Sequence, residues 1–339
     1  MSEAQRRKVQ HVAARLSVVA IAALFAACDG VQTGGIDPRP EPERIAYGEP
    51  RELARLANER VNESSGLAAS RLRDDVFWTH NDSGDAPRIY AFDSKGADLG
   101  TWRVKGAKAS DWEDMASFTL DGKAYLLLAD CGDNALRRSH GTLYLVEEPA
   151  DKESPAKLVQ TVEFTFEGGP RDCEAVAFDR ARRLVLLAGK RIDPDCEVFQ
   201  LPWPAIPTAQ DANAESVESA DSESGDDLPP DEQPDEQPDD RIVAEKIGTL
   251  ELSLATGMDI SPDGSRAIII TYGDAYEFTH RKGEDWREAF SRGSRNLPMP
   301  ERRQGEAICY GPDGKILYLT SEHAPAPFWE LPVVVPARR

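Results

Sequence analysis

A short pattern, an acidic residue followed by small and apolar residues, recurs along the chain and limits the folds open to it. The leading acids of the five occurrences are Glu63, Glu113, Glu174, Asp259 and Glu306. They are spaced 50, 61, 85 and 47 positions apart, and subtracting the 32 residues of an acidic insertion shortens the third interval to 53. A regular interval of about 50 residues is typical of the blades of a β-propeller.

Each repeat continues with runs of β-branched and aromatic residues that predict short strands. The dipeptides Asp121-Gly122, Asp263-Gly264 and Asp313-Gly314 lie before such runs and are good hairpin signals. Outer strands are expected at 101–104, 158–166 and 244–252. The fourth repeat offers only a poor candidate at 287–290, and the fifth has none before the C-terminus.

Regular short strands with almost no amphipathic helix predict an all-β fold, as a sandwich, a barrel or a propeller. Five similar four-stranded units favour a single β-propeller over residues 49–337. Five blades are expected, or six if the long third interval contains a degenerate blade. Residues 51–56 are placed to supply the missing outer strand and close the ring.

The N-terminus has the pattern of an export signal. A basic stretch precedes a twelve-residue apolar run, Leu16 to Ala27, which is too short to span a bilayer. Small residues directly before Cys28 resemble a bacterial lipobox, which implies a signal peptide at 1–27, a lipidated Cys28 and a tether at 28–48. The alternative is an ordinary signal peptide. We expect an exported, membrane-anchored lipoprotein at the periplasmic side or the cell surface.

The chain is acidic, with a formal net charge of −20, but the charge is unevenly spread. Residues 209–240 hold 13 Asp and Glu and no Lys or Arg, so about −7 remains for the rest. This segment is too polar to offset its ordering entropy, and we expect a disordered loop within the propeller. The acidity argues against nucleic acid as a partner, because binding to its backbone depends on Lys and Arg.

Four cysteines remain after Cys28, namely Cys131, Cys173, Cys196 and Cys309. An even number in an exported protein allows disulfides, with three connectivities if all are paired. Buried free thiols or a single bridge are equally compatible with the sequence. No C-x-x-C spacing is present, which argues against a cysteine-based metal site.

The repeat acids are the candidate metal ligands. If they begin the innermost strands, Glu63, Glu113, Glu174, Asp259 and Glu306 surround one mouth of the central channel, with Asp114 beside Glu113. Carboxylates that converge need compensation, and Ca²⁺ accepts six to eight oxygen ligands with tolerant geometry. The alternative is that each acid caps loop N–H groups or pairs with Lys190, Arg191 or Arg88.

A second polar set follows each acid by 13 to 18 residues, at the end of the second strand. It includes His80, Asp82, Asp130, Lys190, Arg191, Asp274 and His323. Because a hairpin returns the chain to the edge where it started, these residues should lie beside the acids. A cation with two histidines and a basic pair suits an anionic ligand such as a phosphate ester, although loop capping is the simpler role for each residue.

Several segments carry a family resemblance. Thr79-His-Asn-Asp-Ser-Gly84, Asp111-Trp-Glu-Asp-Met-Ala116 and Asp130-Cys-Gly-Asp-Asn134 resemble a group of secreted bacterial propellers described as WD40-like or esterase-like and phytase-like. The similarity continues through 172–175, 257–264 and 305–308. It implies a propeller fold. Propeller phytases hold phosphate with Ca²⁺, but their full acidic and basic set is not evident here.

Other chemistries lack their signatures. The chain has no G-x-S-x-G elbow, no phosphate-binding glycine loop and no H-E-x-x-H motif. Glycoside hydrolysis needs only two carboxylates, but the nearby aromatic residues Trp78 and Trp112 are expected to be core. We expect a scaffold that binds a protein or a small anionic ligand, with Ca²⁺ at the mouth. The alternative is a Ca²⁺-dependent phosphoric ester hydrolase, in which His80 or His323 acts as acid or base and Lys190 and Arg191 bind the anion.

Overall fold

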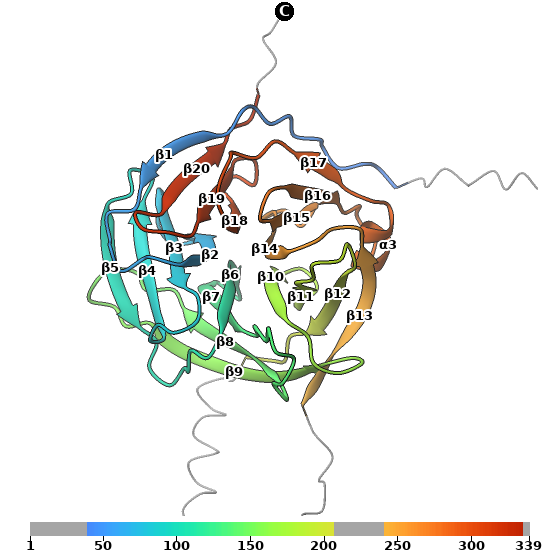
Figure 1. Cartoon of the computed structure of the whole chain (residues 1–339), viewed down its shortest axis with the longest axis horizontal. Helices are drawn as coiled ribbons and strands as arrows, with labels where there is room; N and C mark the ends of the chain where they lie inside the picture. The colour runs from blue at the N-terminus through green and yellow to red at the C-terminus, as the bar shows by residue number, and fades with distance from the viewer. Residues whose placement is uncertain (1–38, 207–240, 335–339) are drawn as a thin grey trace, which may run out of the picture. The chain divides into compact units, whose positions relative to one another are not determined.

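Four-stranded antiparallel units repeat along the chain and surround a common centre (Figure 1). The computed structural model describes residues 39–206 and 241–334. The chain divides into two units, Met1–Arg39 and Pro40–Arg339, and the propeller belongs to the second of them. The predicted signal peptide at 1–27, Cys28, residues 28–38 of the predicted tether and the insertion at 209–240 lie outside the described residues.

Each unit runs from an innermost to an outermost strand. The first contains β2 (Ser64–Ala69), β3 (Val76–Asn81), β4 (Arg88–Asp93) and β5 (Asp98–Arg103). The second contains β6 (Trp112–Leu120), β7 (Lys123–Asp130), β8 (Gly141–Glu147) and β9 (Lys157–Phe166). The third contains β10 (Cys173–Asp179), β11 (Leu184–Gly189), β12 (Cys196–Pro202) and β13 (Ile242–Leu250).

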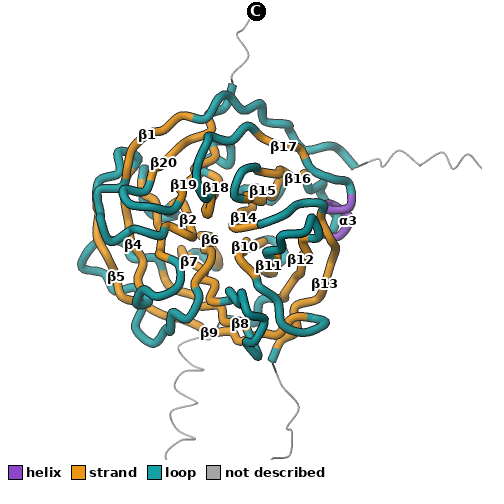
Figure 2. The backbone as a smooth tube through the Cα atoms, in the orientation of Figure 1, coloured by secondary structure: helices purple, strands orange, loops and turns teal. Residues whose placement is uncertain are grey.

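The last two units complete the ring. The fourth contains β14 (Ala255–Ile260), β15 (Arg266–Thr271), β16 (Ala275–Thr279) and β17 (Arg295–Leu297). The fifth contains β18 (Gly305–Tyr310), β19 (Leu317–Ser321), β20 (Pro327–Leu331) and β1 (Arg51–Arg55). The tube in Figure 2 shows the strands of these units stacked outward from β2, β6, β10, β14 and β18. The predicted all-β propeller is confirmed.

An N-terminal strand closes the ring, as predicted. β1 pairs antiparallel with β20, with Arg51 opposite Glu330, and the guanidinium of Arg51 lies 2.5 Å from the Glu330 carboxylate. A second tie joins neighbouring units: β13 pairs parallel with β9 between Ile242 and Phe164. Through the pairing of β1 with β20, the first and last parts of the propeller sequence share one sheet.

The fourth unit differs from the prediction. The candidate outer strand at 287–290 is wrong, because these residues lie in helix α3 (Trp286–Ser291), and β17 is the outer strand. Asp285 caps the helix by accepting a hydrogen bond from the Glu288 N–H at 2.7 Å. Trp286, Ala289 and Phe290 are buried on one face at helical spacing, so amphipathic packing determines the structure here.

Apolar layers between neighbouring units form the core. Phe118 of β6 and Phe178 of β10 stack with ring centroids 3.7 Å apart. Trp78 and Trp112 are fully buried in one of these layers, in agreement with their expected core role. Within the described residues no helix is long and apolar enough to cross a membrane.

Candidate metal centre

An extra residue interrupts the pairing of every innermost strand near its start. The register shift occurs between Trp112 and Asp114 in β6 and recurs at the corresponding place in β2, β10, β14 and β18. A β-bulge of this kind re-aims side chains at the end of a strand. The residues at or within the bulges are Ser65, Glu113, Glu174, Thr256 and Glu306. Three of the five predicted acids are therefore equivalent.

The other two predicted acids do not occupy this position. Glu63 lies before β2, and its backbone N–H donates to the side chain of Asn81 at 3.3 Å. Asp259 lies three residues after Thr256, further along β14. The bulges and the strand pairing set this register, and a sequence pattern of acids followed by apolar residues cannot reveal either.

Asp114 and Asp259 are held by backbone N–H groups inside the propeller. Asp114 is fully buried and accepts hydrogen bonds from Met115, Val176 and Met258, which belong to three different units, at 2.8 to 2.9 Å. Asp259 accepts from Ile260 and Tyr310, both at 2.8 Å. These two carboxylates join neighbouring innermost strands, and the structure does not bring them into the acid cluster described next.

Three carboxylates from the first and second units converge: Asp82 follows β3, Asp111 precedes β6 and Glu113 lies in its bulge. One oxygen of each lies within 4.8 Å of the others. Two oxygens at about 2.4 Å from one Ca²⁺ ion can be at most about 4.8 Å apart. Within the described part of the chain, no hydrogen-bond donor reaches the Asp111 or Glu113 carboxylate. The three groups form the candidate metal centre.

Gly132 makes room for this centre. A Cβ at this position would overlap Glu113 Oε1 and would come too close to the carboxyl group of Asp111. The Gly132 N–H donates to the Asp111 carbonyl at 3.3 Å, which holds the loop after β7 against the start of β6. Only a residue without a side chain lets the two carboxylates lie against this loop.

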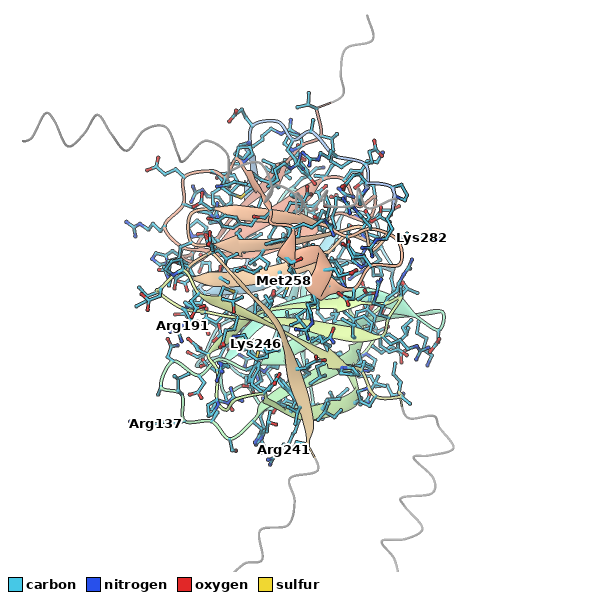
Figure 3. The ribbon with its side chains drawn as sticks, turned by 90° about the vertical axis from the view of Figure 1, so that its right-hand side faces the viewer. Arg137, Arg191, Arg241, Lys246, Met258 and Lys282 are labelled. Carbon is cyan, nitrogen blue, oxygen red and sulfur yellow. The ribbon has the colours of Figure 1, made fainter. Side chains whose placement is uncertain are left out.

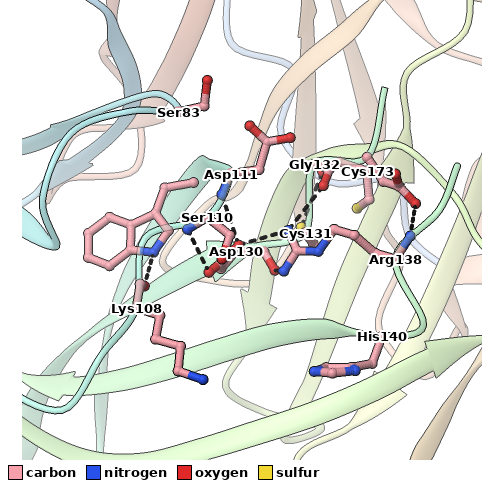
Figure 4. Close-up of polar contacts among 12 residues, drawn as sticks. Ser83, Lys108, Ser110, Asp111, Asp130, Cys131, Gly132, Arg138, His140 and Cys173 are labelled. Atoms are coloured by element: carbon pink, nitrogen blue, oxygen red, sulfur yellow. Dashed lines mark hydrogen bonds and ion pairs between the residues drawn. The ribbon is translucent and has the colours of Figure 1, made fainter. Parts of the chain in front are cut away.

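Asp130 positions the metal centre without belonging to it (Figure 4). Its carboxylate accepts hydrogen bonds from the backbone N–H of Ser110 at 3.2 Å and of Asp111 at 3.0 Å. Arg138 compensates its charge, with guanidinium and carboxylate 2.8 Å apart. Nearby, Asp172 accepts from the Asp133 N–H at 2.7 Å and thereby connects the second and third units.

Seven acids gather around the centre, and we call this group the acidic mouth. Its members are Asp82, Asp111, Glu113, Asp172, Glu174, Glu306 and Glu322. Burial, with the charges of neighbouring acids, raises the pKa of Asp111 to about 6 and that of Glu113 well above its usual value. The Asp82 carboxylate acts in the same direction on each of the other six.

Lys190 supplies a positive charge beside the acids of the mouth. Its ammonium lies 2.5 Å from Glu174 and 5.1 Å from the ring centroid of Tyr272. Burial opposes its charge, but the Glu174 carboxylate raises its pKa, so Lys190 stays protonated. The predicted position beside the acids is thus observed, with Glu174 as the partner of Lys190.

The remaining candidates for catalysis lie in different surroundings. His80 is fully buried, packs edge-on against Trp112 with centroids 5.4 Å apart, and has its pKa lowered by burial. His323 is exposed, with Nδ1 3.6 Å from Glu322. Arg88 pairs with Asp85 at 2.8 Å. Arg191 is exposed and lies with Arg137 at one face of the propeller, whereas Lys282 lies at the other (Figure 3).

Asp82 and Asp111 were not among the predicted ligands. Both belong to the segments that carried the family resemblance, and Asp82 was assigned to the second polar set. The signal was therefore present in the sequence. It could not be used alone, because the approach of Asp82 to Glu113 depends on how the first unit packs against the second.

The sequence matches no protein-family model and no curated protein. Among solved structures, the chain is similar to a gluconolactonase from Xanthomonas campestris, with 12% identity, coverage of 88% of this chain and 99% of that chain, and a TM-score of 0.42. It is also similar to the Pan2 WD40 domain of Neurospora crassa, with 9% identity, coverage of 87% and 99%, and a TM-score of 0.37. The likeness concerns the fold alone.

Proposed function

We propose that the protein is an exported, lipid-anchored β-propeller that binds a ligand at its acidic mouth through a Ca²⁺ ion held by Asp82, Asp111 and Glu113. The observation that carries the proposal is the convergence of three carboxylates, of which Asp111 and Glu113 receive no hydrogen bond from any residue in 39–206 or 241–334. Uncompensated negative charge is costly, and a bound cation removes that cost.

The donor set favours Ca²⁺ over softer metals. All three ligands are carboxylate oxygens, and His80, which precedes Asp82 by two residues, is fully buried and packs against Trp112. Oxygen ligands suit hard cations, and Ca²⁺ tolerates irregular geometry better than Mg²⁺ does. Exported proteins also meet Ca²⁺ at concentrations that fill weak sites.

Three protein ligands leave coordination positions for oxygen atoms of a ligand, because Ca²⁺ takes six to eight. Ser110 and Asp130, which are next to Asp111 in sequence and in hydrogen bonding, line a cleft of about 460 Å³ together with Lys108, Arg137 and His140. Cation and basic side chains together favour a small anionic ligand or an acidic group of a partner protein.

The described residues favour binding over phosphoester hydrolysis. His80 is buried, and Lys190 is engaged by Glu174, so the hydrolase alternative would depend on the exposed residues His323 and Arg191. We therefore propose that the propeller binds its ligand without hydrolysing it. Ca²⁺-dependent turnover of phosphate esters by the purified protein would establish hydrolysis instead.

Thermal unfolding of the purified protein with EDTA, Ca²⁺ or Mg²⁺ tests the metal centre. Ca²⁺ at 100 times its Kd should add about 2.7 kcal/mol to the free energy of unfolding. Asp111→Asn should abolish this gain, whereas Asp74→Asn, which removes an exposed acid in the turn between β2 and β3, should retain it. An unchanged Ca²⁺ response in Asp111→Asn would refute the proposed ligand set.

The proposed anchor rests on the sequence around Cys28 and has its own test. Wild-type protein should fractionate with membranes and incorporate a labelled fatty acid. Cys28→Ala should do neither. Recovery of the wild-type protein in the soluble fraction without label would refute lipidation and leave the metal centre unaffected.

A further inference from the structure

Two of the four described cysteines meet between the second and third units. Cys131 follows β7, and Cys173 begins β10, 42 positions later. The Cys131 thiol donates to the Cys173 carbonyl at 3.2 Å, and the Cys173 N–H donates to the Cys131 carbonyl at 3.4 Å. Each cysteine thus makes one hydrogen bond to the carbonyl oxygen of the other, which holds the two residues side by side, as a disulfide requires.

The side chains also face the same layer of the core. Cys131 and Cys173 both belong to the apolar cluster between the second and third units, and both are buried free thiols in the structure. Cys196 lies in the cluster on the other side of the third unit, and Cys309 lies in the layer of the first and fifth units. Of the possible connectivities, only the Cys131–Cys173 pair shares one core layer.

We propose that Cys131 and Cys173 form a disulfide that links the second and third units directly beneath the acidic mouth. Two S–H bonds break and one S–S bond forms, and two electrons and two protons pass to a disulfide oxidant, which is reduced to two thiols. Cys131 is flanked by Asp130 and Gly132, which lie against the start of β6 that carries Asp111 and Glu113. Cys173 is flanked by Asp172 and Glu174 of the acidic mouth. The bond therefore fastens the loops that carry them.

Peptide mapping tests the pairing without any variant. The purified full chain is equilibrated with oxidised glutathione, denatured, alkylated without reductant and digested. We expect a linked peptide pair containing Cys131 and Cys173, with Cys196 and Cys309 alkylated. Alkylation of all four thiols, or a link from Cys173 to Cys196, would overturn the proposal.

Stability provides a second readout. The linked chain should lose roughly 5–10 °C in Tm when dithiothreitol is added, because the cross-link restricts the unfolded chain. The double variant Cys131→Ala/Cys173→Ala should show no such change, and the matched control Cys196→Ala/Cys309→Ala should retain it. Equal responses in both variants would contradict the assignment. The measurements use EDTA throughout, so they do not depend on Ca²⁺ binding.

Discussion

Carboxylates occupy two regions of the propeller and are compensated in opposite ways. Asp114 and Asp259 lie between the innermost strands and accept backbone N–H groups from neighbouring units. Asp111 and Glu113 lie at the mouth, where no donor in the described residues reaches them. The same functional group is structural where donors surround it and a candidate ligand where they do not.

Removing an interior acid should have the largest effect. Asp114→Ala leaves the N–H groups of Met115, Val176 and Met258 without their acceptor in a water-excluded position. We expect a loss of about 3–5 kcal/mol in the free energy of unfolding, measured by urea denaturation. The Ca²⁺-induced stabilisation should persist in whatever fraction folds. A loss below 1 kcal/mol would show that the N–H groups find other acceptors.

Filling the space at Gly132 should damage the mouth without touching an acid. In Gly132→Ala the new methyl group would overlap Glu113 and crowd Asp111. We therefore expect the free energy of unfolding to fall by about 1–3 kcal/mol and the stabilisation by Ca²⁺ to be lost. Thermal unfolding with and without Ca²⁺ measures both. Gly273→Ala is the matched control, since a Cβ there meets no atom within 4 Å. A normal Ca²⁺ response in Gly132→Ala would contradict the described geometry.

Neutralising a mouth acid should have the opposite sign from neutralising an interior one. Glu113→Gln removes a carboxyl group whose ionised form is disfavoured by burial and reached by no donor among the described residues, and we expect a gain of about 1–2 kcal/mol in the free energy of unfolding at pH 8 in EDTA. The same variant should lose its stabilisation by Ca²⁺. Urea denaturation under both conditions separates the two effects. Destabilisation in EDTA would mean that Glu113 has a structural partner.

Stability in EDTA should also decline as pH rises, because of Glu306. Burial raises its pKa to about 9, against the opposing charge of Lys190, so the native state keeps a proton that the unfolded chain has lost. This contribution is complete below the ordinary pKa of 4.5 and is lost as pH rises towards 9. One such group changes stability by up to about 1.4 kcal/mol per pH unit.

Urea denaturation between pH 5 and 8.5 measures this slope. Glu306→Gln should flatten it, whereas Glu301→Gln, which removes an exposed acid in the loop before β18, should leave it unchanged. Equal slopes in wild type and Glu306→Gln would indicate that Glu306 is ionised and paired in the native state.

The fold was largely predictable because it is built from repeated local signals. Hairpin turns and β-branched runs placed the strands, and the missing strand of the fifth repeat pointed to closure by residues 51–56. The structure of the fourth unit was harder to predict, because its short outer strand β17 follows helix α3. The cap and the apolar face of this helix became clear only with the packing of Trp286.

By itself, the sequence determined the all-β class, the repeat, the N-terminal closure and the acidic residues available for a site. Only the tertiary structure decided which acids meet, because that depends on one extra residue in each innermost strand and on the packing of neighbouring units. Glu113 and Asp111 meet Asp82 across the boundary between the second and first units. Asp259, with the same charge and a similar local pattern, is turned towards the Tyr310 N–H instead.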